Sequence, residues 1–512
     1  MRTRWVARLG LGFLLATACG PSAGDVARWE ATEPDGVERL ERLLADPAAK
    51  PDLRADAAMA MIHAVRRGRH PGVERLAEWL GRAPPAEADA ILERLAPRLR
   101  AEIARERPGG DGVEDPSLPA KDLAVLLLLD GSVHGEATKA ALREALLGWV
   151  HVSTAARLGD RGQRTSVPQS MRLLGAPAVD HLPTLVDEDV ALPELAALVR
   201  DLGDAKTKAG MTGALVARDE RLASPAGAAE LGRAIEAANA KSGVRPTAAL
   251  VEAQLDEHRA RVRGRTLEAL VTLGDPRSQA HVLERAVDAR EPGSARRAAL
   301  DALRPVATKL VPAELERLVV VAKDEAHGDV ATRVAAAELL VDAGAPHATL
   351  LALFDARTWR VRFVAAEALL ASPSLDVAEL VRHLPADERA PMSVVEPLVY
   401  GRALAKKPGA AALLAPLRAG RALGPKLVAL AALGEGGEGA KAELVRARSD
   451  TAKVPACSDR GDCAWRCQTG LGLRSGRSRV STVGEFVEDC VLPSLGQPHP
   501  WLPPAEPTGK TR

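Results

Sequence analysis

Four of the chain's five cysteines lie near its carboxyl end, and their thiols are the first candidates for chemistry. They follow the pattern C-x5-C-x3-C-x22-C at Cys457, Cys463, Cys467 and Cys490. Zinc sites usually contain closer pairs, such as C-x2-C or C-x4-C, and only the middle gap approaches that spacing. Disulfides are the favoured interpretation in an exported chain, because thiols pair in oxidising compartments.

The first 18 residues have the composition of an export signal. Arg2, Arg4 and Arg8 form a basic head, and an apolar run of ten residues extends from Leu9 to Ala18. This run is too short to span a bilayer as a permanent helix, which needs about 20 apolar residues. The sequence therefore predicts an exported protein that loses residues 1–18 as a signal peptide.

Cys19 is the fifth cysteine, and it ends a run of small residues in Leu15-Ala16-Thr17-Ala18-Cys19-Gly20. This segment resembles the bacterial lipobox, although that family usually has Leu at the position of Ala16. The resemblance implies that the Cys19 thiol carries a diacylglycerol and begins the mature chain, with residues 19–33 forming the lipidated cysteine and a tether. Gly20, where some families have Asp for inner-membrane retention, implies the outer membrane. The alternative is a simple secreted protein.

The predicted export also implies that the four distal cysteines form disulfides, because the chain would meet an oxidising compartment. Four cysteines allow three pairings, of which we favour Cys457 with Cys467 and Cys463 with Cys490. Residues 450–495 are then a disulfide-bonded cap that covers the last helices of the chain. The proline-rich residues 496–512 read as a disordered tail. One bound zinc per chain is the alternative to the disulfides.

The other residue types that carry chemistry form no recognisable catalytic pattern. The 11 histidines are scattered, and no H-E-x-x-H motif or G-x-S-x-G elbow occurs. We therefore expect no catalytic residue, no metal, no cofactor and no small-molecule substrate. Tryptophans are frequent in binding hot spots, so they are candidates for an interface, with simple packing as the alternative; they are Trp29, Trp79, Trp149, Trp359 and Trp465.

Charge and composition narrow the class of protein. Lys and Arg number 69 against 68 Asp and Glu, so no global field would attract nucleic acid. Hydrophobic residues make up 46% of the 512 residues but aromatic residues only 2%. Small aliphatic side chains suit closely packed helices, and a chain of this length exceeds a single compact core. An elongated helical array is the expected architecture.

A repeated helical frame supports that architecture. In Arg362-Phe363-Val364-Ala365-Ala366-Glu367-Ala368-Leu369, small or apolar residues lie at +3, +4 and +7 from the arginine, which is one face of a helix. The same frame begins at Arg333, Arg296 and Arg263, with spacings of 33, 37 and 29 residues in chain order. Weaker copies begin at Arg54, Lys208 and Lys426. Alanines such as Ala365 and Ala366 would let neighbouring helices approach closely.

With turns such as Gly274-Asp275-Pro276-Arg277 ahead of apolar helices, these frames resemble the HEAT-repeat family. The resemblance implies an all-α fold, a right-handed α–α superhelix of the HEAT or armadillo type. The family places an Asp ahead of the Arg to form a ladder, and here Asp355 and Asp329 precede Arg362 and Arg333 at unequal intervals. HEAT arrays serve many unrelated tasks, so the resemblance is specific for architecture only.

The expected order along the chain follows from these segments. N-terminal helical hairpins occupy 34–105, a Gly- and Pro-rich linker 106–119, divergent helical repeats 120–257 and HEAT-like repeats 258–449. A further break lies in Leu158 to Pro168.

The predicted function is a membrane-anchored, non-enzymatic scaffold of the bacterial cell envelope that binds an unidentified protein partner. An enzyme or enzyme subunit on a helical-repeat scaffold and a purely structural spacer are the alternatives. A deep pocket with convergent polar groups would favour the enzyme, and the lack of an exposed apolar patch would favour the spacer.

Overall fold

The computed structural model describes residues 21–31, 35–66, 69–105, 117–159, 164–188, 191–242, 247–386, 395–454 and 480–495. Helices account for most of these residues, and no β-strand occurs among them apart from two isolated bridges. The predicted all-α fold is therefore confirmed. No helix within the described ranges is long and apolar enough to cross a membrane.

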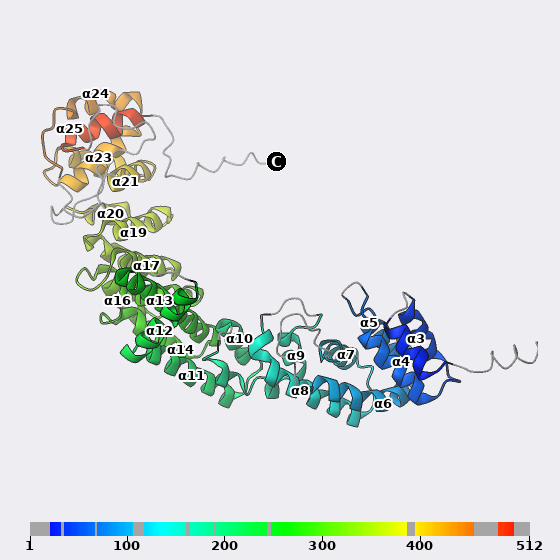
Figure 1. Cartoon of the computed structure of the whole chain (residues 1–512). Helices are drawn as coiled ribbons and strands as arrows, with labels where there is room; N and C mark the ends of the chain where they lie inside the picture. The colour runs from blue at the N-terminus through cyan, green and yellow to red at the C-terminus, as the bar shows by residue number, and fades with distance from the viewer. Residues whose placement is uncertain are drawn as a thin grey trace, which may run out of the picture. The chain divides into compact units, whose positions relative to one another are not determined.

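The chain divides into two compact units, Met1–Arg218 and Asp219–Arg512. The first contains a series of helices and two short 3-10 turns (Figure 1). These are α2 (Ala23–Ala31), α3 (Gly36–Ala45), α4 (Pro51–His63), α5 (Gly72–Arg82), α6 (Pro85–Ile103), α7 (Ser117–Leu129), α8 (Glu136–Arg157), α9 (Val167–Leu174), η1 (Ala176–Ala178), η2 (Leu182–Leu185), α10 (Leu192–Leu202) and most of α11 (Ala205–Ala223).

Helices of the first unit stack as hairpins. Helix α4 packs on α6 and α6 packs on α8, while α3 packs on α4, α6 on α7 and α8 on α9. The stacked faces are small and aliphatic, with Leu40, Leu76, Leu95 and Leu146 fully buried between them. Regular helices give way after α9 to η1, η2 and the turn between them.

The second unit begins inside α11. Its further elements are α12 (Pro225–Lys241), α13 (Ala248–Leu273), α14 (Pro276–Val287), α15 (Gly293–Leu303), η3 (Arg304–Lys309), α16 (Pro312–Lys323), α17 (Val330–Asp342), α18 (His347–Leu351), η4 (Ala352–Asp355), α19 (Trp359–Ala371), α20 (Val377–Arg382), α21 (Val395–Ala405), α22 (Ala410–Leu414), η5 (Ala415–Ala419), α23 (Leu423–Gly434), α24 (Glu438–Ala447), α25 (Val483–Phe486), η6 (Val487–Val491) and η7 (Leu492–Ser494).

Odd-numbered helices of the second unit form one continuous layer. Helix α13 packs on α15, α15 on α17, α17 on α19, α19 on α21 and α21 on α23. A second layer lies against it, in which α14 packs on α16, α16 on α18 and α20 on α22. Each hairpin thus contacts chiefly its neighbours, as in a solenoid. The HEAT-like all-α solenoid is the observed fold, and the right-handed sense stays a prediction.

Short turns begin these helices where the sequence places caps. Gly274 adopts a left-handed backbone with φ of 78°, which ends α13 without the penalty that a Cβ would bring. The Asp275 carboxylate then accepts hydrogen bonds from the backbone amides of Arg277 and Ser278, and Pro276 is the first residue of α14. Asp329 caps α17 and Asp376 caps α20 in the same way.

Three expected boundaries differ from the structure. Residues 23–31 of the predicted tether form α2, and Val26 is buried in it. Arg66 holds this helix by donating to the carbonyl oxygens of Trp29 and Glu30, a long-range contact that local composition does not reveal.

The predicted boundary at 257/258 falls inside the continuous α13, and the unit boundary falls inside α11 rather than at a linker. The predicted break between Leu158 and Pro168 separates α8 from α9, although Val167 and Pro168 already belong to α9.

Candidate functional site

The repeat arginines are interior residues of the second unit. Arg263, Arg296 and Arg362 are at most 1% exposed, and Arg333 is 9% exposed. A guanidinium cannot be buried without hydrogen-bonding acceptors, because its desolvation is costly. The acceptors of each arginine therefore show what the repeat frame does.

Arg263 on α13 is paired on two sides. Its guanidinium donates to Asp219 at 2.8 Å and to Glu291 at 2.6 Å. Asp219 also contacts His281 at 3.0 Å and accepts from Arg285 at 2.9 Å. Burial raises the pKa of Asp219, but the hydrogen bonds from His281 and Arg263 outweigh it and lower that pKa to about 2. The cluster joins α11, α13 and α14 to the turn before α15.

Arg362 on α19 makes the most symmetrical pair. It donates from Nε and an Nη atom to the two carboxylate oxygens of Glu396, each at 2.9 Å, and both side chains are fully buried. The Tyr400 hydroxyl donates to Glu396 at 3.2 Å. Burial opposes the charge on Arg362, but Glu396 outweighs it and raises the pKa of Arg362. Burial and Glu396 together raise the pKa of Tyr400 well above its ordinary value.

Several of these arginines have an acidic partner later in the sequence, whereas Asp219, the other partner of Arg263, precedes its arginine. Glu291 and Asp324 lie 28 residues after Arg263 and Arg296, and Glu396 lies 34 residues after Arg362. Arg402 on α21 contacts Glu435 at 3.1 Å in the same sense. In the first unit Arg54 on α4 pairs with Glu87, 33 residues later. Each pair therefore links one hairpin to the next.

The HEAT resemblance implies a ladder in which Asp355 would pair with Arg362 and Asp329 with Arg333. The structure shows that this prediction is wrong for both aspartates. Asp355 contacts Lys323 at 3.1 Å, and Asp329 caps α17 through the amide of Thr332 at 2.6 Å. Both carboxylates lie at helix ends, where local amides and lysines use their oxygens. Arg333 makes the weakest contact of the series, 3.8 Å from Glu325, and its Nε is buried without a hydrogen-bond partner.

The alanines of the frame lie in the helix interface. Ala365 is 0% exposed and Ala366 is 1% exposed on α19, which packs against α17, α18 and α21. Small side chains at these positions leave room for the neighbouring helix backbones. The structure thus places the arginines and the alanines of the frame in the interior, where they pack and pair the helices.

None of the four described tryptophans is exposed. Trp79 lies beneath the Arg54 guanidinium, whose carbon is 5.7 Å from the ring centroid, and the Lys121 ammonium is 5.0 Å from the centroid of Trp149. Trp359 contacts Phe363 edge to face at 6.0 Å. These contacts favour packing over an interface for the described indoles. Trp465 lies outside the described residues.

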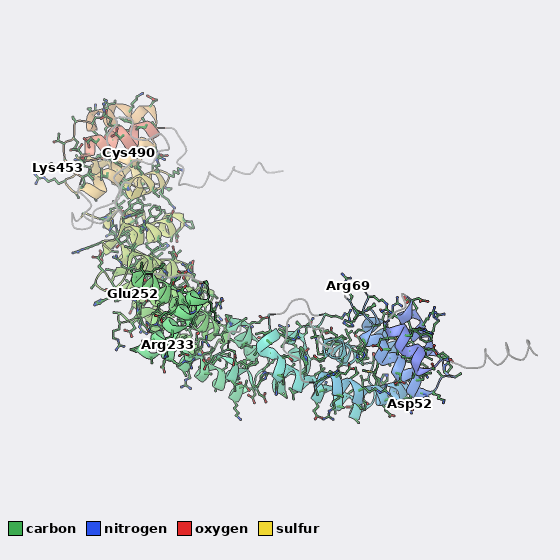
Figure 2. All side chains as sticks on the ribbon, in the orientation of Figure 1. Asp52, Arg69, Arg233, Glu252, Lys453 and Cys490 are labelled. Carbon is green, nitrogen blue, oxygen red and sulfur yellow. The ribbon has the colours of Figure 1, made fainter. Side chains whose placement is uncertain are left out.

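Most of the predicted cysteine chemistry also falls outside the described ranges. Cys19, Cys457, Cys463 and Cys467 are not among the residues described. Cys490 lies in η6, is 0% exposed and is disulfide-bonded. It packs with Leu427, Leu430 and Phe486 in the core of the carboxyl-terminal helices (Figure 2). The pairing of the four cysteines stays a prediction.

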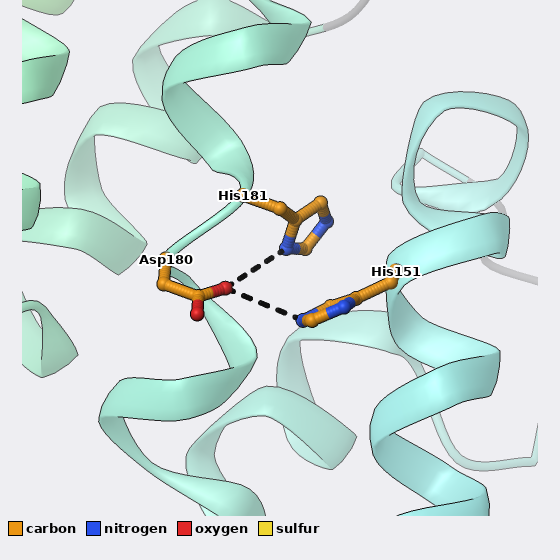
Figure 3. A group of neighbouring side chains, drawn as sticks. All are labelled: His151, Asp180 and His181. Carbon is orange, nitrogen blue, oxygen red and sulfur yellow. Dashed lines mark ion pairs between the residues drawn. The ribbon is translucent and has the colours of Figure 1, made fainter.

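A second cluster, in the first unit, was not apparent from the sequence. His151 lies on α8, and Asp180 and His181 lie in the turn between η1 and η2 (Figure 3). Each of the three offers one ligand atom, and the three atoms lie within 4.8 Å of one another. His151 Nε2 is 3.4 Å from Asp180 Oδ1, and His181 Nδ1 is 4.0 Å from the same oxygen.

Two prolines and two buried apolar residues hold this turn. Pro177 and Pro183 set the first turns of η1 and η2, where their missing amides are not needed. Val179 and Leu182 are fully buried on either side of Asp180 and His181. The turn therefore directs the carboxylate and the imidazole toward α8, where the His151 ring lies 4.2 Å from the His181 ring.

The electrostatics of the cluster keep its inner histidine neutral. Burial and, to a smaller extent, the nearby His151 lower the pKa of His181 to about 4, and Asp180 offsets only part of this effect. Both His181 ring nitrogens are buried without a hydrogen-bond partner. Asp180 is 60% exposed, so the cluster opens to solvent on the carboxylate side.

No protein-family model and no curated protein matches the chain. Among solved structures, the chain is similar to the karyopherin Kap121p, in its crystal structure bound to the SUMO protease Ulp1p. The identity is 14% and the TM-score is 0.32, over 79% of this chain and 42% of the karyopherin. The chain thus spans less than half the length of that karyopherin, and a likeness this distant carries no argument about function.

Proposed function

We propose that the chain is a lipid-anchored, non-enzymatic scaffold in the bacterial cell envelope, and that its helical solenoid binds a protein partner. The observation that carries the proposal is the stacking of hairpins in two layers with buried arginine–acid pairs between successive hairpins. Such pairs hold neighbouring hairpins in a fixed relation, because breaking one leaves a buried charge uncompensated. A solenoid built in this way presents a long continuous surface for a partner.

The anchor is supported by the amino-terminal sequence. A basic head, a short apolar run and the lipobox-like segment ending in Cys19 favour export followed by lipidation. Lipid-modified cysteines with two or more acyl chains hold a protein stably at a membrane, whereas a single chain binds only marginally. The outer membrane, with the solenoid on its periplasmic face, is the proposed destination.

Fractionation of the full-length chain tests the anchor. Cys19→Ser should move the protein from the membrane fraction to the soluble fraction and abolish labelling by a radioactive fatty acid. Ser22→Ala, three residues later, is the matched control and should change neither. Membrane retention of the Cys19→Ser protein would show that another region holds it there.

Site-specific photo-crosslinking in intact cells tests the partner. Val320 is 69% exposed on α16, and Ala371 is exposed at the end of α19, so the two positions report on different layers of the same solenoid. A photoreactive residue on the layer that binds should give one discrete protein adduct, and the other layer should give none. Absence of a discrete adduct from both layers would contradict the scaffold proposal for this part of the array.

A further inference from the structure

The more buried histidine of the cluster on α8 lacks hydrogen-bond partners for its ring nitrogens, which is unusual for a residue with a structural role alone. His181 has both ring nitrogens buried and without hydrogen-bond partners, although its side chain is 15% exposed. An unsatisfied buried polar group is energetically costly, so proteins normally pair such groups. Its neighbours within reach are another imidazole and a carboxylate, which are also electron-pair donors.

We infer that His151, Asp180 and His181 form a zinc-binding site that joins α8 to the turn between η1 and η2. The donor set is two imidazole nitrogens and one carboxylate oxygen, a combination that suits Zn²⁺ and not the oxygen-seeking Mg²⁺ or Ca²⁺. Three protein ligands leave one position of a tetrahedral ion for water.

The spacing of the donor atoms fits a small ion. Zinc bonds of about 2.0 to 2.2 Å place neighbouring tetrahedral ligands about 3.3 to 3.6 Å apart. His151 Nε2 and Asp180 Oδ1 are 3.4 Å apart, and His181 Nδ1 is 4.0 Å from Asp180 Oδ1. Small side-chain rotations would close the remaining distances, because all three atoms already lie within 4.8 Å.

The surroundings of the three side chains let an ion reach the site and place a backbone oxygen beside it. The Asp180 side chain is 60% exposed, which gives an ion a path to the site from the carboxylate side. The carbonyl oxygen of Pro177 lies 3.2 Å from His151 Nε2, so a backbone oxygen adjoins the three side-chain donors. Without an ion, His151 Nε2–H can donate a hydrogen bond to this carbonyl, whereas ligation of zinc by Nε2 requires the tautomer that carries its hydrogen on Nδ1. Binding should therefore fix the turn against α8.

Zinc binding by the purified full-length chain tests the inference. The chain is stripped with EDTA, kept without reductant so that cysteine thiols do not compete, and titrated with zinc chloride against a fluorescent chelator. One zinc ion should bind per chain and raise the melting temperature. His151→Ala, Asp180→Asn and His181→Ala should each weaken binding by more than about 100-fold, since loss of even an outer-shell partner costs about 10- to 100-fold.

His134→Ala is the matched control, because His134 is an exposed histidine just before α8 in the same unit. It should bind zinc as the unaltered chain does. Far-UV circular dichroism must show unchanged helix content in every variant, and Asp180→Asn alters a side chain that is 60% exposed. Unchanged zinc affinity in that folded variant would overturn the inference.

Cobalt substitution separates this site from the cysteines near the carboxyl end. A nitrogen- and oxygen-ligated Co²⁺ should show tetrahedral d–d absorption without a thiolate charge-transfer band. A thiolate band, or binding that survives all three substitutions, would place the metal at the cysteines and contradict the site on α8. The result does not depend on the anchor or the partner, so it can fail without affecting the proposed scaffold.

Discussion

The regular hairpins of the second unit and the turn after α9 in the first unit treat buried polar groups differently. In the second unit, Arg263 and Arg362 are fully buried, and carboxylates of neighbouring segments accept their hydrogen bonds. In the turn, both nitrogens of His181 are buried without such partners. A buried charge that is hydrogen-bonded in a repeated position indicates a structural role, and a buried neutral polar group without partners in an irregular segment indicates a place for a ligand.

The largest effect is expected from breaking a buried pair in the regular region. Arg362→Ala leaves Glu396 buried without its cation, and should lower the free energy of unfolding by about 3 to 5 kcal/mol. Arg297→Ala removes an exposed arginine from α15 and should change it by less than about 0.5 kcal/mol. Denaturant unfolding measures both. Equal effects of the two substitutions would mean that the buried pair contributes no more to the free energy of unfolding than an exposed arginine does.

The carboxyl-terminal cap is held by a covalent bond where the hairpins use ion pairs. Cys490→Ser should destabilise the cap by about 2 to 4 kcal/mol, because the disulfide no longer restricts the unfolded chain. Limited proteolysis should then cut near 480–495 before it cuts the middle hairpins. Cys463→Ser should match it if the favoured pairing holds, and Cys457→Ser should not. Mass spectrometry of unreduced protein that finds all four thiols free would contradict the disulfides.

Acid should weaken the regular region through Asp219. Its pKa in the folded chain is about 2, below the ordinary value of about 3.9. The stabilisation is therefore complete above about pH 5 and is lost as the pH falls through 4 toward 2. The difference between the two pKa values corresponds to roughly 2 to 3 kcal/mol. Asp219→Asn should remove this part of the pH dependence, whereas Glu220→Gln, at an exposed neighbour, should leave it in place. Identical acid titrations of both variants would contradict the role of Asp219.

Packing at the frame alanines should give a smaller effect. Ala366→Leu adds volume where α19 meets its neighbours and should cost about 1 to 3 kcal/mol. Ala371→Leu adds the same volume at the exposed end of α19 and should be nearly neutral. Thermal unfolding distinguishes them. An unchanged melting temperature for Ala366→Leu would count against close helix packing.

The sequence predicted which residues of the repeat frame share one helix face in the regular region, because the helical period alone determines this. Arg263, Arg296, Arg333 and Arg362 share a face with small residues, and all four are buried as the stacking requires. Their acceptors were not predicted, since Glu291 and Glu396 lie 28 and 34 residues later, across turns of unequal length. Local spacing does not determine which carboxylate meets which guanidinium.

The cluster on α8 was missed for a related reason. His151 is 30 positions before His181, and the two meet where η1 and η2, each with a proline in its first turn, bring the chain back against α8. The sequence signal that could have found it is Asp180-His181 between two apolar anchors, Val179 and Leu182, beside two prolines. Irregular segments of this kind have no period from which a contact can be predicted.

A double-mutant cycle at Arg362 and Glu396 tests most directly whether the buried pairs fasten one hairpin to the next. The free energy of unfolding is measured for Arg362→Met, Glu396→Leu and the double variant. The two single changes should each be costly and the double change much less so, with an interaction energy of more than about 1.5 kcal/mol. Additive effects within about 0.5 kcal/mol would show that the residues act independently, and would contradict the account.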